Sequence, residues 1–467
     1  MADADLPRDT ERRIERFVRD WLADEKLPGA SLAVARDDEV VYADGFGSRD
    51  LAENRPATAD TLYGIGSVTK SFAGLAVMQL QEAGELDVND PATDYLEIDL
   101  PEEIELHHLL THSSGLPSLG VSEALIARQA GVAELGVPLG SREDFHAHVE
   151  GGLDEIAADP GERFMYCNTG YTLLGEAIEE ITGRSFAAYV ESEILSPLGM
   201  ERSTFDGEAY AADDDSATPY WMGGEGEETG SESTSDATAP EPTELPVREL
   251  SKAPGGLKSS VRELVRYLAC QRNGGELDGA RLVGPDAFEQ MHAEHVETDA
   301  GPYGYGWRRR EVAGETVVGH GGSIAVSTAY AGFTPDDEWS VAVLCNGAAD
   351  PGPKSVALGV FATLLGGEPE DAPAFARQER IGDLTGTYET YRGIRTAEVS
   401  ETGETLQLEF TDPFGEEPSP LIPADDSLEE PEFYQLSSSG ERQTAEFDVR
   451  EDGTDLYVDR WRLRKVD

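Results

Sequence analysis

The stretch TLYGIGSVTKSFAGLAVMQLQEAG, residues 61–84, decides the fold of this 467-residue chain. Its second part, 67–83, is apolar on nearly every side and ends at Gly84, which predicts a helix buried at the centre of the protein. Ser67 and Lys70 lie three residues apart at the start of that helix, so their side chains share one face. Because burial disfavours the charged form of a lysine, such a lysine can take the proton of a serine hydroxyl and make it a nucleophile. By itself, an SxxK pair is also compatible with a capping serine and a solvated lysine.

A tyrosine and an asparagine two residues apart stand just before a second predicted helix, at 171–182. Tyr166 and Asn168 lie on a loop after the Pro-Gly turn at 160–161, and at that spacing both side chains can point the same way. A phenol can relay a proton, and an amide can hold Lys70 and a substrate. The pair alone is equally compatible with a core tyrosine beside a helix-capping asparagine.

The third motif, His320-Gly321-Gly322-Ser323, ends a predicted strand. Two glycines without a Cβ allow a substrate to lie against the strand backbone, and the amide of Ser323 can pair with that of Ser67 as an oxyanion hole. A His-Gly-Gly turn at a strand end is the simpler explanation of this motif by itself. The three motifs together are more specific, because each lies on the secondary structure that its chemistry requires.

Hydrophobic periodicity places strands at both ends of the first 365 residues and helices between them. An amphipathic helix from Asp9 precedes a predicted hairpin at 30–47, and three more strands are predicted within 316–347. This order predicts an α+β fold: an antiparallel sheet made by the N- and C-terminal segments and flanked by helices, plus an all-helical region. Further helices are predicted at 261–271 and 354–365.

On these motifs, the chain resembles the serine β-lactamase-related family, in particular the class C β-lactamase, D,D-peptidase and esterase branch called the CubicO group. Besides the three motifs and the stretch around Ser67, four stretches resemble family landmarks: LHHLLTHSSGLP at 106–117, PGERFMYCNTGYTLLG at 160–175, ILSPLGM at 194–200 and APGGLKSS at 253–260. The resemblance covers most of residues 25–365. It implies the fold of β-lactamases and penicillin-binding proteins.

The resemblance also implies a serine hydrolase that forms an acyl-enzyme on Ser67. Lys70 and Tyr166 then share the base and acid duties, and which of them takes the first proton stays open. His320 is expected to orient the leaving group or Tyr166. It stands where β-lactamases usually have lysine, which disfavours dedicated β-lactam hydrolysis because the fixed positive charge for the β-lactam carboxylate is weakened.

A small ester or amide is therefore the expected substrate, cleaved by an enzyme of the esterase or peptidase type. A β-lactamase or D-aminopeptidase-like amide hydrolase is one alternative, and a catalytically silent penicillin-binding-type binding protein is another. His107, His108 and His112 form a cluster with partial metal-ligand spacing, but the resemblance identifies their stretch as a structural landmark. No metal or cofactor is expected.

The rest of the chain predicts a second module. Residues 223–244 hold seven acids, no base and no large apolar residue, so a disordered surface insert is expected within a hydrolase domain at 1–365. The stretch 366–379 is expected to be a linker. Short alternating runs at 380–467 predict a small C-terminal all-β, barrel-like module.

Charge is the most unusual global property: 93 acidic against 36 basic residues give a net charge of −57. Such a surface excludes nucleic acid and anionic membranes as partners, and it is typical of an intracellular halophilic protein. The three cysteines have no CxxC spacing, and no export signal or apolar membrane segment is recognisable, so a cytoplasmic location is expected. The sequence leaves the oligomeric state open.

The charge generates a first prediction. At molar salt the Debye length falls to about 3 Å, so the mutual repulsion of surface carboxylates is screened. The melting temperature should therefore rise steeply between dilute buffer and multi-molar KCl, as followed by circular dichroism. A flat profile would contradict the halophilic interpretation.

Overall fold

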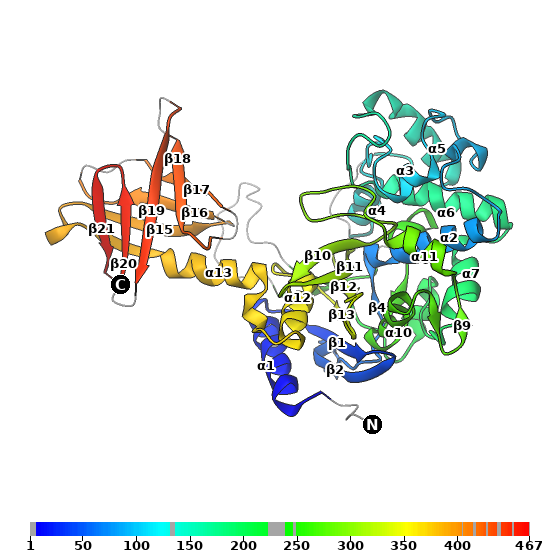
Figure 1. The fold of residues 1–467 in the computed structure, drawn as a ribbon, viewed down its shortest axis with the longest axis horizontal. Helices are drawn as coiled ribbons and strands as arrows, with labels where there is room; N and C mark the ends of the chain where they lie inside the picture. The colour runs from blue at the N-terminus through cyan, green and yellow to red at the C-terminus, as the bar shows by residue number, and fades with distance from the viewer. Residues whose placement is uncertain are drawn as a thin grey trace. The chain divides into compact units, whose positions relative to one another are not determined.

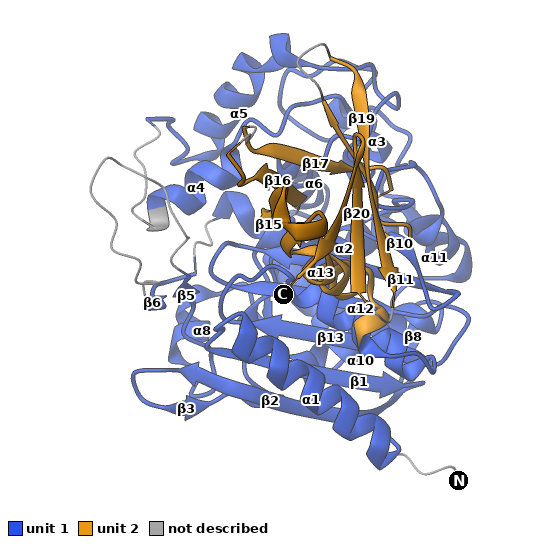
Figure 2. Cartoon of the chain, turned by 90° about the vertical axis from the view of Figure 1, so that its left-hand side faces the viewer, with its two compact units in different colours: residues 1–369 blue, residues 370–467 orange. Residues whose placement is uncertain are grey.

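The chain forms two compact units, Met1–Pro369 and Glu370–Asp467, each described here by itself (Figure 2). The computed structural model describes residues 6–130, 136–222, 239–245, 249–403, 405–413, 417–425, 428–436, 440–450 and 453–466. None of the helices in these ranges is long and apolar enough to cross a bilayer.

The first unit is built on one antiparallel sheet of seven strands, in the order β10-β11-β12-β13-β1-β2-β3 (Figure 1). The N-terminal hairpin joins the C-terminal strands through β1 and β13, where Leu32 lies opposite Val343. The predicted sheet made from both ends of the domain is therefore confirmed. Its strands are β1 (Gly29–Arg36), β2 (Glu39–Asp50), β3 (Arg55–Pro56), β10 (Arg308–Val312), β11 (Glu315–Ser323), β12 (Thr328–Phe333) and β13 (Trp339–Cys345).

Helices pack on the sheet because its central strands, β1, β12 and β13, are buried on both faces. Ala33, Ala342 and Leu344 share one hydrophobic core with α2 (Thr69–Glu82) and α10 (Val261–Arg272). The terminal helices α1 (Arg8–Asp24) and α12 (Pro353–Leu364) pack against each other and against β2 and β13. The indole Nε1 of Trp21 on α1 donates to the carbonyl of Pro351, 2.7 Å away, and ties α1 to the segment that precedes α12.

The helical region surrounds α2, which is buried along almost its whole length as the sequence predicts. A single 3₁₀ turn, Gly66–Val68, precedes α2 and carries Ser67. Among the helices that contact α2 are α6 (Asn168–Thr182), α9 (Lys252–Gly255) and α11 (Pro285–His292). The others in this region are α3 (Leu106–Leu110), α4 (Val121–Ala130), α5 (Arg142–Gly151), α7 (Phe186–Val190) and α8 (Gly207–Ala212).

The acidic segment predicted to be disordered, 223–244, lies mostly outside the described residues. Its C-terminal end differs from the expectation, since Glu241–Pro242 (β6) pairs with Tyr220–Trp221 (β5). Tyr220 is buried, and the amide of Thr243 donates to the carbonyl of Pro219 over 2.9 Å. Backbone pairing beside a buried aromatic side chain therefore orders this end in spite of its composition.

The second unit is a closed barrel of eight antiparallel strands, as predicted for the C-terminal module. Barrel closure joins β14 to β21, where Tyr388 lies opposite Lys465. The strands are β14 (Gly386–Glu389), β15 (Thr396–Thr402), β16 (Thr405–Phe410), β17 (Ser419–Pro423), β18 (Glu432–Leu436), β19 (Arg442–Arg450), β20 (Gly453–Val458) and β21 (Trp461–Lys465).

The stretch 366–379, expected to be a linker, contains most of a helix, because α13 spans Pro373–Leu384. Proline at the first helical position favours the start of a helix. Ile381 and Leu384 at its C-terminal end are buried with the side chains of the barrel core. The sequence shows no helical periodicity here because only these two positions of α13 are buried.

Candidate active site

Lys70 is the centre of the predicted site, and its side chain is completely buried. Its Nζ donates three hydrogen bonds: to Ser67 Oγ at 2.9 Å, to Asn168 Oδ1 at 2.7 Å and to the carbonyl of Pro254 at 2.7 Å. The acceptors come from the turn before α2, from α6 and from α9. Three elements that are distant in sequence are therefore oriented by one ammonium group.

Burial determines the protonation of this lysine. Removal of water from around Nζ lowers the pKa of Lys70 to about 7, more than the nearby Glu123 carboxylate raises it. A neutral amine is therefore accessible near neutral pH, and it lies within hydrogen-bond distance of the Ser67 hydroxyl. This is the geometry in which a lysine can activate a serine.

Tyr166 and Asn168 meet Lys70 as the YxN motif predicts. Asn168 is the first residue of α6, and the amide of Gly170 donates to Cys167 Sγ at the helix start. Lys70 Nζ lies 4.8 Å from the centre of the Tyr166 ring. Burial raises the pKa of Tyr166, whereas a hydrogen bond with Ser67 lowers it. The residue as a whole is 38% exposed, so one side of it borders open space, while its hydroxyl is buried and reaches Ser67.

The turn that carries Ser67 lies against the end of β11. A Cβ on Gly322 would lie 2.0 Å from the Ile65 carbonyl and 3.0 Å from the Ser67 amide nitrogen. A Cβ on Gly66, whose φ is +51°, would lie 2.7 Å from the Ser323 amide nitrogen. Only glycines permit these two main chains to approach so closely. The approach brings the Ser67 and Ser323 amides to one place, the arrangement that the predicted oxyanion hole requires.

His320 belongs to a chain of polar groups that ends on the backbone at both sides. The Cys167 amide donates to His112 Nδ1 at 3.0 Å, and the carbonyl of Gly321 accepts from His320 Nδ1 at 2.5 Å. The Tyr303 hydroxyl lies between them, 3.2 Å from His112 Nε2 and 3.0 Å from His320 Nε2. Burial lowers the pKa of His320 to about 3 and that of His112 well below its ordinary value, so both rings are neutral.

Neutral rings with these backbone partners leave one hydrogen-bond direction through the chain. His112 Nε2 donates to the Tyr303 oxygen, and the Tyr303 hydroxyl donates to His320 Nε2. Both nitrogens of His320 are therefore engaged within the protein, and its ring stands as a neutral wall beside Tyr166. The centres of the His320 and Tyr166 rings are 6.3 Å apart.

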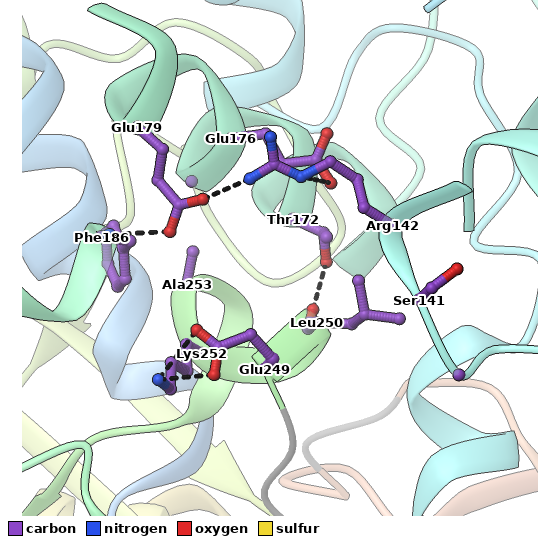
Figure 3. A pocket seen from close by; sticks show the side chains of 12 residues that line it. Ser141, Arg142, Thr172, Glu176, Glu179, Phe186, Glu249, Leu250, Lys252 and Ala253 are labelled. Carbon is purple, nitrogen blue, oxygen red and sulfur yellow. Dashed lines mark hydrogen bonds and ion pairs between the residues drawn. The ribbon is translucent and has the colours of Figure 1, made fainter. Parts of the chain in front are cut away.

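Two hollows meet at Ser67. The open one, about 630 Å³, is bordered by Tyr166, Arg308, Arg310 and His320 among others. The other has about 110 Å³ and is lined by Leu125, Ile126, Pro254 and Ile324, with Glu123 at both hollows. A third cavity of about 210 Å³, drawn in Figure 3, contains neither Ser67 nor Lys70 in its lining.

Several groups of the site were not predicted from the sequence. The Pro254 carbonyl lies in the APGGLKSS stretch and His112 in the LTHSS stretch, so the landmarks contained them without indicating their roles. Tyr303, Arg308 and Glu123 carried no recognisable signal. In the histidine cluster, His108 Nδ1 accepts from the Glu105 amide at 3.1 Å. Within the described ranges, no three His, Cys, Asp or Glu side chains are arranged as metal ligands.

A sequence model of the family described as Beta-lactamase matches residues 14–361. The chain belongs to the β-lactamase family. This membership confirms the predicted family and fold. A second model, described as Pab87 octamerisation domain, matches residues 369–464.

Known relatives extend over different shares of this β-lactamase-family chain. The octameric penicillin-binding protein homologue from Pyrococcus abyssi is 36% identical, with a TM-score of 0.85 over 97% of this chain and 99% of that one. Protein flp of Staphylococcus aureus strain MW2 is 26% identical over 75% of this chain and 66% of its own length. A D-aminopeptidase of Gluconobacter oxydans strain 621H is 26% identical over 68% of this chain and 56% of its own length. The chain thus spans less than two thirds of the length of the last two proteins.

The glycines at the end of β11 allow a direct test of the site. Gly322→Ala should lower the rate of Ser67 acylation by about 100-fold or more, because the new Cβ must push the strand end away from the Ser67 turn. Gly321→Ala is the matched control, since its Cβ would meet nothing closer than the Ala329 carbonyl at 3.9 Å. Labelling by a fluorophosphonate probe measures both rates. Equal rates for the two variants would contradict the proposed oxyanion hole.

Proposed function

We propose that this member of the β-lactamase family hydrolyses small amides or esters through an acyl-enzyme on Ser67. The observation that carries the proposal is the 2.9 Å contact between Ser67 Oγ and the buried Nζ of Lys70. A silent binding protein has no physical need for a lysine whose pKa is lowered to about 7 beside a serine hydroxyl. The contact supports catalysis over binding alone.

The steps follow from the contacts. Ser67 Oγ bonds to the substrate carbonyl carbon while its proton passes to Lys70 or Tyr166, and the Ser67 and Ser323 amides hold the oxyanion. The bond to the leaving amine or alcohol then breaks, and the leaving group takes that proton. Water then attacks the acyl-enzyme and gives a proton to the same pair, the bond to Oγ breaks, and Ser67 takes that proton back.

The two hollows at Ser67 indicate the substrate. The apolar pocket of about 110 Å³ has room for a small aliphatic side chain, and the Glu123 carboxylate at its rim suits a free amino group. On the open side, Arg308 and Arg310 have no carboxylate partner among the described residues, so they suit an anionic leaving group. A short peptide with a free amino group and a free carboxylate fits both sides. The D-aminopeptidase relative supports this class and makes a D-residue the first one to try.

β-Lactams fit the site less well. His320 replaces the usual lysine, and because burial and the charge of Lys70 lower its pKa to about 3, it offers no positive charge to a carboxylate. β-Lactam hydrolysis therefore stays the second candidate, supported by the family alone.

Turnover of p-nitrophenyl acetate and of D- and L-leucine p-nitroanilide in multi-molar KCl tests the proposal. The wild-type protein should release a Ser67-dependent burst followed by turnover, and Ser67→Ala should lose at least about 1000-fold of the rate. Nitrocefin is added as the β-lactam substrate. If folded wild type and Ser67→Ala give the same rates on every substrate, the hydrolase proposal fails and a silent scaffold replaces it.

We propose further that the second unit assembles the chain into an oligomer, and that this oligomer is an octamer. The match to an octamerisation domain and the octameric Pyrococcus abyssi homologue support this. Tyr391 and Ile394, in the connection between β14 and β15, are 81% and 66% exposed. Two large apolar side chains so exposed, three residues apart, suit a contact with a second copy.

Replacement of both residues tests this surface. The double variant Tyr391→Ser/Ile394→Ser should shift the mass measured by light scattering toward smaller species, because the apolar contact area is lost. Leu51→Ser, which removes a side chain 44% exposed in the first unit, is the control and should keep the wild-type mass. An unchanged mass for the double variant would exclude this connection from the interface.

The charge of −57 supports a saline working environment, and three free, buried cysteines suit a reducing compartment. On these two observations we propose that the protein works in the cytoplasm of a halophile.

A further inference from the structure

Helices α6 and α9 touch at a glycine. A Cβ built on Gly175 would lie 2.7 Å from the Cβ of Ala253, far inside an ordinary contact, and the next neighbour would be 3.9 Å away. Alanine in place of a helix-interior glycine usually stabilises a helix. Glycine at this position therefore makes α6 less stable than alanine would, but it permits the close approach of α9.

The two helices that meet at this contact supply two of the three acceptors of Lys70. Asn168 begins α6, seven residues before Gly175, and Pro254 follows Ala253 directly on α9. Thr172 Oγ1, one turn before Gly175, also donates to the Leu250 carbonyl at 2.9 Å (Figure 3). The spacing between α6 and α9 consequently determines whether both acceptors can reach one Nζ.

We infer that Gly175 is a positioning residue, which sets the distance between α6 and α9 and thereby places the Pro254 carbonyl on Lys70. The inference rests on the proposed function, because its consequence for catalysis passes through Lys70. Gly175 itself touches neither Ser67 nor Lys70 in this arrangement.

The surroundings make a shift of α9 the expected response to a larger side chain. α9 has only four residues, so it is the element expected to yield, and the contact of Gly175 with Ala253 lies at the border of the cavity of about 210 Å³ in Figure 3. Ordinary contact of two methyl groups needs about 1 Å more than 2.7 Å. A movement of that size takes the Pro254 carbonyl out of hydrogen-bond range of Nζ, since the present distance is 2.7 Å.

The test is a reciprocal exchange of the two small residues. Gly175→Ala should lower the second-order rate of Ser67 labelling by a fluorophosphonate about 10- to 100-fold, because the base is misplaced. The acidic limb of the pH–rate profile should move to lower pH, since an ammonium that loses an acceptor gives up its proton more easily. The double variant Gly175→Ala/Ala253→Gly removes the clash. It should restore both the rate of Ser67 labelling and the position of the acidic limb.

Gly170→Ala is the matched control on α6. Its Cβ would lie 3.5 Å from Leu109, an ordinary contact, so it adds the same methyl group to the first turn of α6 without a clash. The Gly170→Ala variant should keep the acidic limb of the pH–rate profile at its wild-type position. If Gly175→Ala does not fold, Ala253→Ser adds an atom to the same contact from the side of α9. The acidic limb of the pH–rate profile should then also move to lower pH, but by less.

The outcomes separate the two proposals. If Ser67 of the wild type does not react with the probe, the hydrolase proposal fails. If the wild type reacts and Gly175→Ala keeps its rate and limb, or the double variant stays as impaired as Gly175→Ala, the positioning role of Gly175 is overturned.

Discussion

The burial of one ammonium group organises the catalytic unit. Lys70 is surrounded by protein, and a charged group without water must be paired or lose its proton. Its three acceptors come from the Ser67 turn, from α6 and from α9, so the requirement to satisfy Nζ also orders the site. The same burial that makes the lysine costly to charge makes it available as a base near neutral pH.

The close approach of main chains is the second constraint. At Gly66 and Gly322 the turn before α2 and the end of β11 come together, and at Gly175 two helices do. Each contact lies beside polar atoms of the proposed site: the Ser67 and Ser323 amide nitrogens in the first case and the Pro254 carbonyl that accepts from Lys70 in the second. Small residues in this fold are therefore as much a part of the chemistry as the polar ones.

His112 and His320 are neutral because burial lowers the pKa of both rings, so they add no charge to the site. His112 and His320 are held in one tautomer through Tyr303 by backbone groups at both ends. The wall beside Tyr166 is consequently uncharged, and the charged side chains of the open hollow are Arg308, Arg310 and Lys354 together with Glu123 and Asp350. In a chain of charge −57, two arginines without a carboxylate partner among the described residues support the proposal that this hollow takes an anionic group.

The sequence by itself determined the antiparallel sheet, the buried helix at 67–83 and the roles available to Ser67, Lys70, Tyr166 and Asn168. It could do so because periodicity and residue spacing are local, and because three ordered motifs together are specific. Only the tertiary structure decided which groups meet Lys70, that Tyr303 joins His112 to His320, and that Glu241–Pro242 and α13 are ordered. Those outcomes depend on contacts between segments up to 191 residues apart, and a sequence pattern carries no distance between such segments.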